Sequence, residues 1–130
     1  MSGARGEAKV TAWTRRDGTL GLAGREIGVA SLTPPRPRGR PVIMLHGGGH
    51  TGECYLRTPD GRPECAELFA AAGRSVHVVD WPGRGRAPRL DDFADLSAHE
   101  VVASLASLAR AVGPAVVLAH SAGGPMAWRL

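Results

Sequence analysis

Residues 116–124 read Val-Val-Leu-Ala-His-Ser-Ala-Gly-Gly, and this stretch decides the fold. An apolar segment typical of a β-strand, 115–119, runs into Ser121, and a helix is expected to begin near Pro125. A serine on a sharp turn between a buried strand and a helix N-terminus has the geometry of a nucleophile elbow. The turn projects the hydroxyl away from the sheet, and free backbone N–H groups lie beside it. The usual pattern is G-x-S-x-G, and Ala119 stands at its first position.

A second apolar segment ends in a run of glycines. Residues 41–50 read Pro-Val-Ile-Met-Leu-His-Gly-Gly-Gly-His, so a strand at 42–45 leads directly into the loop Gly47–Gly49. Acyl transfer needs an activated nucleophile and donors that face the oxygen on which charge develops. Glycine N–H groups are uncrowded, and the N–H of Ala122 at the head of a helix is a natural second donor. Short Ser/Gly runs are common in loops, but the two segments together indicate an acyl-transfer site.

The composition is that of an ordinary globular domain. The chain has 130 residues, of which 43% are hydrophobic and 22% charged, and this length fits one domain. Residues 1–40 carry eight Lys/Arg against three Asp/Glu, whereas residues 41–130 carry eight against nine. The basic excess therefore lies outside the part that carries the motifs. A nucleic-acid-binding role for the Arg-rich stretch 34–40 is a weak alternative, because the whole chain has only six aromatic residues.

The sequence carries no sign of a membrane or metal partner. No stretch approaches the ~18 apolar residues of a membrane span, and residues 1–7 contain no apolar run typical of a secretory signal. Cys54 and Cys65 form neither a disulfide framework nor a metal-ligand spacing, and both are expected to be reduced. We therefore expect a cytoplasmic protein with no cofactor, no metal, no membrane partner and no nucleic-acid partner.

Buried strands alternate with helices along the chain. The expected N-terminal parts are a flexible segment at 1–7, an antiparallel hairpin at 8–32 and a stiff Pro/Arg connector at 33–41. The hairpin is expected to have strands at 9–14 and 25–32 and a turn at 16–19. After the connector, we expect strands at 42–45, 75–80 and 115–119, a helix at 64–72 with Pro63 as its first residue, and a helix that runs from the capping box Ser97–Glu100 to Gly113. This order predicts an α/β fold in which helices cover both faces of a parallel sheet. Active sites of such sheets lie beyond the carboxyl ends of the strands.

Three motifs in this order resemble a known family. They are HGGGHTG at 46–52, TPDGRP at 58–63 and VDWPGRGR at 79–86. The chain resembles the N-terminal part of an α/β-hydrolase-fold enzyme, and the motifs are similar to HG-x-x-x-TG, TPDGRPGW and VD-x-PGRGRS of a group of bacterial serine esterases. The likeness covers about residues 8–130. It departs from that group at Glu64-Cys65, which replaces Gly-Trp, and at Ala87, which replaces a serine.

The resemblance implies a role for each site residue. Ser121 would be the nucleophile, and the N–H groups of Gly48 and Ala122 would form the oxyanion hole. His46, Gly47 and Gly49 would belong to the oxyanion loop, with His46 holding the loop in place. The implied function is that of a carboxylesterase-like serine hydrolase acting on a small-molecule ester or a related acyl substrate.

The acid and the histidine of a catalytic triad are absent from the chain. In this fold both follow the nucleophile, but residues 122–130 contain no histidine and no carboxylate. Among upstream groups, His77 is expected in a buried strand, His120 is expected to point away from the hydroxyl of Ser121, and Asp80 is expected to stabilise a turn.

Two functional classes therefore stay open. We expect an incomplete α/β-hydrolase domain, residues 1–130, truncated after the elbow, whose isolated polypeptide is poorly soluble and lacks esterase turnover. The alternative is a catalytically inactive fragment or a binding module.

Overall fold

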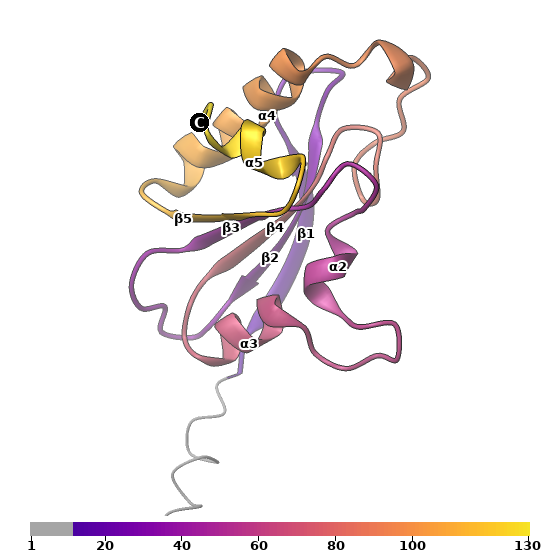
Figure 1. The fold of residues 1–130 in the computed structure, drawn as a ribbon. Coiled ribbons are helices and arrows are strands. Elements are labelled where there is room, and N and C mark those ends of the chain that lie inside the picture. The colour runs from indigo at the N-terminus through magenta and orange to yellow at the C-terminus, as the bar shows by residue number, and fades with distance from the viewer. Residues whose placement is uncertain (1–11) are drawn as a thin grey trace, which may run out of the picture.

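The computed structural model describes residues 12–130, which form one mixed sheet with helices on both faces (Figure 1). The elements in chain order are β1 (Thr14–Leu20), β2 (Ile27–Thr33), β3 (Val42–Leu45), α2 (Glu53–Leu56), α3 (Cys65–Ala71), β4 (Val76–Asp80), the 3-10 helix η1 (Phe93–Asp95), α4 (Ala98–Val112), β5 (Val116–Ala119) and α5 (Gly123–Ala127). None of the helices in this described part is long and apolar enough to cross a membrane.

The sheet has the strand order β1-β2-β4-β3-β5. β3 is parallel to both β4 and β5, whereas β2 is antiparallel to β1 and β4. The chain crosses the sheet in one direction from β3 to β4 and in the other direction from β4 to β5. Because parallel crossovers are right-handed in nearly all proteins, the two connections place their helices on opposite faces, with α2 and α3 below the sheet and α4 and α5 above it in Figure 1. The predicted α/β fold is confirmed.

The core consists of two layers separated by the sheet. Alternate residues of β3 show why: Met44 packs with the α2 and α3 side, and Ile43 packs with the α4 and α5 side. Side chains of a strand alternate between the two faces, so a strand covered on both faces reads as a continuous apolar run. All four residues of β3 are buried, as the sequence predicts.

The hairpin forms, but the predicted turn at 16–19 is wrong. Asp17 and Gly18 lie inside β1, opposite Ala30 and Val29. The chain turns at residues 21–26 instead, where Gly21 and Gly24 have φ of 121° and 77°. Asp-Gly pairs favour turns, but β1 is an edge strand whose exposed face accepts the carboxylate. Residues 9–11 of the predicted first strand lie outside the described residues.

Asp17 is held on that exposed face by two arginines. Its carboxylate lies 2.9 Å from Arg15 Nε and 3.1 Å from Arg86 Nε. The hydrogen bond from Arg15 and the nearby guanidinium charges lower the pKa of Asp17.

Of the two predicted helix starts, that of α4 is confirmed and that of α3 is wrong. The capping box of α4 is present: Ser97 Oγ accepts from the Glu100 N–H at 3.2 Å, and the Glu100 carboxylate accepts from the Ser97 N–H at 3.0 Å. The prediction that Pro63 is the first residue of α3 is wrong, because Pro63 pairs with Arg57 in an isolated bridge and Glu64 is the N-cap. Helix α2, inside the loop that follows the glycines, was not predicted.

The strand before the elbow, β5, pairs within the described residues only with β3. Val116 and Val117 keep 48% and 37% of their surface exposed. An exposed apolar edge offers unpaired N–H and C=O groups to other strands and promotes association. Within the described residues, β5 is therefore an apolar edge strand of the sheet.

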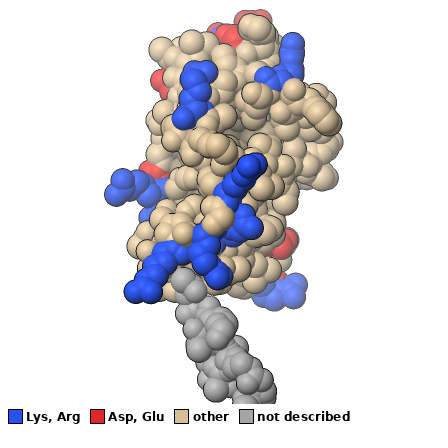
Figure 2. Space-filling model, turned by 90° about the vertical axis from the view of Figure 1, so that its left-hand side faces the viewer, with Lys and Arg blue, Asp and Glu red and all other residues tan. Residues whose placement is uncertain are grey.

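The connector at 33–41 packs against the end of α3. Arg38 donates to the Ala72 carbonyl at 2.9 Å, and Arg74 donates to the Arg40 carbonyl at 2.8 Å. Figure 2 views the side of the molecule on which this connector lies and shows basic side chains gathered on its lower half, with few carboxylates.

Candidate active site

Ser121 occupies a strained turn between β5 and α5. Its φ of 53° is the only positive φ of a non-glycine residue in the part of the chain that the structure describes. A left-handed conformation costs a non-glycine residue on the order of 1 kcal/mol, and such strain concentrates at functional sites. Two backbone hydrogen bonds close the turn: the Gly123 N–H donates to the His120 carbonyl and the Gly124 N–H donates to the Ser121 carbonyl, both at 2.9 Å. Ser121 is exposed, so the elbow geometry expected from the sequence is present.

The start of α5 lies directly on the end of β3. A Cβ atom added to Gly123 would lie 2.9 Å from the His46 carbonyl oxygen and 3.0 Å from the Leu45 carbonyl oxygen. Such contacts with rigid backbone leave room only for glycine at this position. Gly124, the next residue, has open space around the same position.

The glycine loop after β3 abuts the elbow. A Cβ atom added to Gly47 would lie 3.2 Å from Ser121 Cβ, and one added to Gly48 would lie 3.6 Å from Ala122 Cβ. The structure thus brings together Ser121, Ala122, Gly47 and Gly48. Gly49 is exposed, with open space around it.

His46 is a neutral, fully buried residue that joins two loops. Its Nε2 accepts from the Trp81 N–H at 3.1 Å, so Nδ1 carries the proton and donates to the Gly47 carbonyl at 2.6 Å. Burial lowers the pKa of His46. Its ring also stacks on the Trp81 indole, with the ring centroids 5.1 Å apart. These contacts agree with a loop-holding role and leave neither ring nitrogen free to act as a base.

Asp80, at the end of β4, also joins the loop after β3 to the loop after β4. Its carboxylate is 1% exposed and accepts from the Gly52 N–H at 2.6 Å and from the Arg86 N–H at 3.0 Å. The Asp80 carboxylate also fills the space beside Gly52 and Gly85, where a Cβ atom would clash. The interpretation of Asp80 as a turn-stabilising carboxylate is therefore confirmed.

Two further histidines lie beside the elbow. The Nδ1 atoms of His120 and His50 would lie 3.1 and 3.3 Å from a Cβ atom on Gly47, next to Ser121. Their ring centroids are 5.6 Å apart. No hydrogen bond joins either ring to Ser121 among the described residues.

Tyr55 and Trp81 were not recognised as site residues in the sequence. The Tyr55 hydroxyl donates to the Leu45 carbonyl at 2.8 Å, and burial raises the pKa of this phenol to about 12. The Trp81 Nε1–H is buried without a hydrogen-bond partner among residues 12–130. Its ring helps to line a cavity of about 180 Å³ that Gly48 and Met126 also border. The position of Trp81 directly after the buried strand β4, at the carboxyl end of the sheet, is the feature of the sequence that could have indicated its role.

The comparisons with known proteins match this fold. The strand order, the elbow and the glycine loop define an α/β-hydrolase-type fold. The chain belongs to the alpha/beta hydrolase family, whose sequence model matches residues 42–130. No group of three His, Cys, Asp or Glu side chains in the described range is placed to hold a metal ion.

Several relatives and solved structures are similar to the chain. The probable secreted lipase phiG of Fungal sp. (strain ATCC 74256) is 46% identical over 48 residues, which cover 37% of this chain and 13% of the lipase. An epoxide hydrolase from Vigna radiata has a TM-score of 0.66 at 19% identity, over 88% of this chain and 33% of that chain. The thioesterase domain from the curacin biosynthetic pathway has a TM-score of 0.67 at 23% identity, over 88% of this chain and 40% of that domain. At these identities the solved structures support the fold alone, and the chain spans well under half the length of each protein.

Proposed function

We propose that this chain is the nucleophile-bearing part of a carboxylesterase-like serine hydrolase, as in the bacterial esterase group that its motifs resemble. The observation that carries the proposal is the exposed Ser121 at φ 53°, with Gly47 and Gly48 packed against the elbow. The match to a lipase and the membership of a hydrolase family support the same class.

The proposed chemistry begins with attack by Ser121 Oγ on the carbonyl carbon of an ester. The carbonyl oxygen gains the negative charge, and the N–H groups of Gly48 and Ala122 donate to it. Loss of one such donor typically costs about 3–4 kcal/mol of transition-state stabilisation. The proximity of the two residues supports this pairing, because a Cβ atom on Gly48 would lie only 3.6 Å from Ala122 Cβ.

The proton of Ser121 needs a base. His46 is occupied by two hydrogen bonds, and Asp80 is occupied by the loops that it holds. We propose that the histidine and the acid of the triad come from residues outside these 130, and that the 130-residue chain alone has no detectable esterase turnover.

The proposed substrate class rests on the cavity beside the proposed oxyanion donor Gly48. The cavity of about 180 Å³ beside Gly48 is mostly apolar, with Phe93, Leu96 and Met126 among its walls. An apolar wall beside the donors fits the acyl or alcohol part of a small ester.

A fluorophosphonate probe tests the proposal. Attack by Ser121 forms an O–P bond, the P–F bond breaks, fluoride leaves and the hydroxyl proton passes to solvent. Since fluoride leaves readily, we expect slow labelling of Ser121 in the purified chain, identified by tandem mass spectrometry, and no labelling of Ser121→Ala at that site. Ser107 of α4, which does not line the cavity beside Gly48, serves as an internal control.

Two results would contradict the proposal. Labelling of Ser121 no faster than that of Ser107 would favour the inactive fragment or binding module. Turnover of an aryl ester by the purified chain, lost in Ser121→Ala, would show that a base is present within it. In that case His50→Gln and His120→Gln would identify which ring acts.

A further inference from the structure

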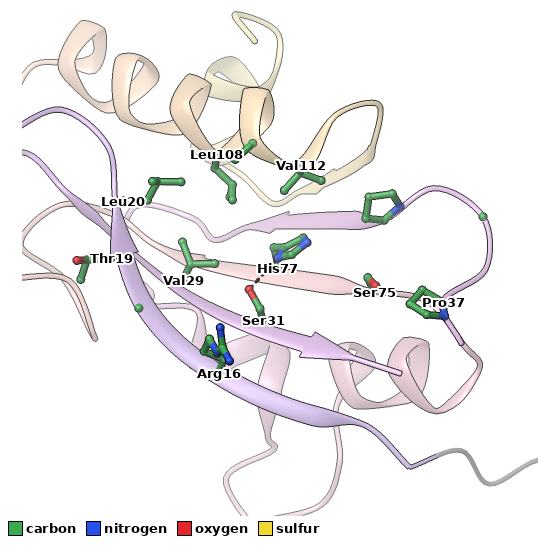
Figure 3. A pocket seen from close by; sticks show the side chains of 14 residues that line it. Arg16, Thr19, Leu20, Val29, Ser31, Pro37, Ser75, His77, Leu108 and Val112 are labelled. Atoms are coloured by element: carbon green, nitrogen blue, oxygen red, sulfur yellow. Dashed lines mark hydrogen bonds between the residues drawn. The ribbon is translucent and has the colours of Figure 1, made fainter. Parts of the chain in front are cut away.

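A second cleft lies on the α4 side of the sheet, near the amino ends of β3 and β4 and away from Ser121. It has a volume of about 550 Å³ and is bordered by strands β1, β2 and β4, by the C-terminal half of α4 and by the connector at 33–41 (Figure 3). Pro41 and Ser75, which precede β3 and β4, line it, whereas Ser121 follows the carboxyl end of β5. A cleft of this size lies within the usual range for small-molecule sites, about 300–1,000 Å³.

Three polar side chains cross the sheet in one row of this cleft. Arg16 of β1 lies opposite Ser31 of β2, and Ser31 lies opposite His77 of β4. Directly opposite residues share a face of the sheet, and all three line the cleft. Ser31 Oγ and His77 Nδ1 are 2.8 Å apart, as the dashed line in Figure 3 shows.

The pair of Ser31 and His77 offers a hydrogen-bond donor in either tautomer. If Nδ1 accepts the serine proton, the histidine keeps an N–H at Nε2. If Nδ1 donates instead, the serine keeps its O–H. One polar hydrogen is therefore left over for a ligand that accepts.

The charge of the cleft is positive. The guanidinium of Arg16 makes no ion pair or hydrogen bond with other residues of the described range 12–130, and no carboxylate is among the side chains that line the cleft there. The arginines at 36, 38 and 40 of the connector do not line the cleft, so Arg16 is its one charged side chain among the described residues. A cationic side chain without a neighbouring carboxylate attracts a ligand of opposite sign.

Most of the remaining lining of the cleft is apolar, and Thr19 and Ser75 are its other polar side chains. Leu20 and Val29 come from the hairpin, and Leu108 and Val112 come from α4 (Figure 3). These four side chains offer a hydrocarbon surface in the same cleft as Arg16. The combination suits a molecule with one anionic end and one apolar end.

We propose that this cleft binds a small amphipathic carboxylate, such as a medium-chain alkyl carboxylate. The carboxylate accepts from Arg16 and from the free donor of the pair Ser31–His77, and the alkyl chain lies against Leu108 and Val112. Binding here is independent of Ser121 and of the proposed hydrolysis.

An NMR titration of the ¹⁵N-labelled 130-residue chain with octanoate tests the proposal. We expect saturable shifts of the amide signals of Arg16, Ser31, His77 and Val112, with little change at Ser121. Arg16→Gln should weaken binding about tenfold or more, because it removes a charge-assisted hydrogen bond. Octan-1-ol, which lacks the charge, should bind correspondingly more weakly than octanoate.

Arg15→Gln is the matched control. Arg15 precedes Arg16 on the same strand, points to the other face and pairs with Asp17, so its loss removes the same charge without touching the cleft. If Arg15→Gln and Arg16→Gln weaken octanoate binding equally, the loss of affinity reflects net charge alone, and the proposal is overturned. Shifts confined to the loop Gly47–Gly49, equal binding of the alcohol, or no saturable binding would each overturn it as well.

Discussion

Replacement of Gly123 by alanine tests the packing that places the elbow. The new Cβ atom would lie 2.9 Å from the His46 carbonyl oxygen and 3.0 Å from the Leu45 carbonyl oxygen, closer than such atoms normally approach. Both oxygens are backbone atoms, one of the last residue of β3 and one of the buried residue that follows it, and they cannot rotate away, so α5 must move. Overpacking of this kind costs about 1–3 kcal/mol, and the gain in helix propensity from Gly to Ala returns at most ~1 kcal/mol. We expect a net loss of about 1–2 kcal/mol in the free energy of unfolding.

Gly124→Ala is the matched variant. It adds the same methyl group one residue later in the same helix, where no atom lies within 4 Å. It should therefore keep or raise stability by up to ~1 kcal/mol. Urea denaturation followed by far-ultraviolet circular dichroism measures both variants. Because the movement of α5 also displaces the Ala122 N–H, Gly123→Ala should slow fluorophosphonate labelling of Ser121 while Gly124→Ala does not. Equal or greater stability of Gly123→Ala relative to Gly124→Ala would refute the packing argument.

Three further predictions follow from the structure. Burial lowers the pKa of both His46 and His77 below 6.5, so near and below that pH the unfolded chain binds more protons than the folded chain. The free energy of unfolding, measured by urea denaturation, should therefore fall between about pH 7.5 and about pH 5, by at most ~1.4 kcal/mol per pH unit for each histidine, and His77→Gln should reduce this slope. Asp80→Asn keeps the shape but places an amide NH₂ among backbone donors, which should cost about 1–3 kcal/mol in urea denaturation. The control Asp91→Asn, at an exposed aspartate, should change little. Val116→Lys places a charge on the open edge of β5 and should raise the monomer fraction in size-exclusion chromatography; unchanged association would show that this edge is not the site of self-association.

Much of the fold could be predicted because its signals are local. The continuous apolar run at 42–45 predicts a strand covered on both faces, and the capping box of Ser97 and Glu100 marks the start of α4. The small residues after Ser121 indicate the elbow. Each of these features depends on neighbouring residues and on the period of the element that they form.

The features that were missed depend on contacts between distant residues. Asp17 and Gly18 form a strand rather than a turn because β2 pairs with them and Arg86 reaches the carboxylate from another loop. The row Arg16, Ser31 and His77 exists only through the register of three strands, and that register is not visible in any one segment.

The most direct test of the proposed site is a crystal structure of the chain phosphonylated at Ser121. The phosphoryl oxygen then stands where the oxyanion of an ester would develop. We predict that this oxygen lies between about 2.7 and 3.1 Å from the backbone nitrogens of both Gly48 and Ala122. A phosphoryl oxygen that faces solvent, with neither nitrogen in hydrogen-bond range, would contradict the oxyanion hole and with it the assignment of acyl chemistry to this elbow.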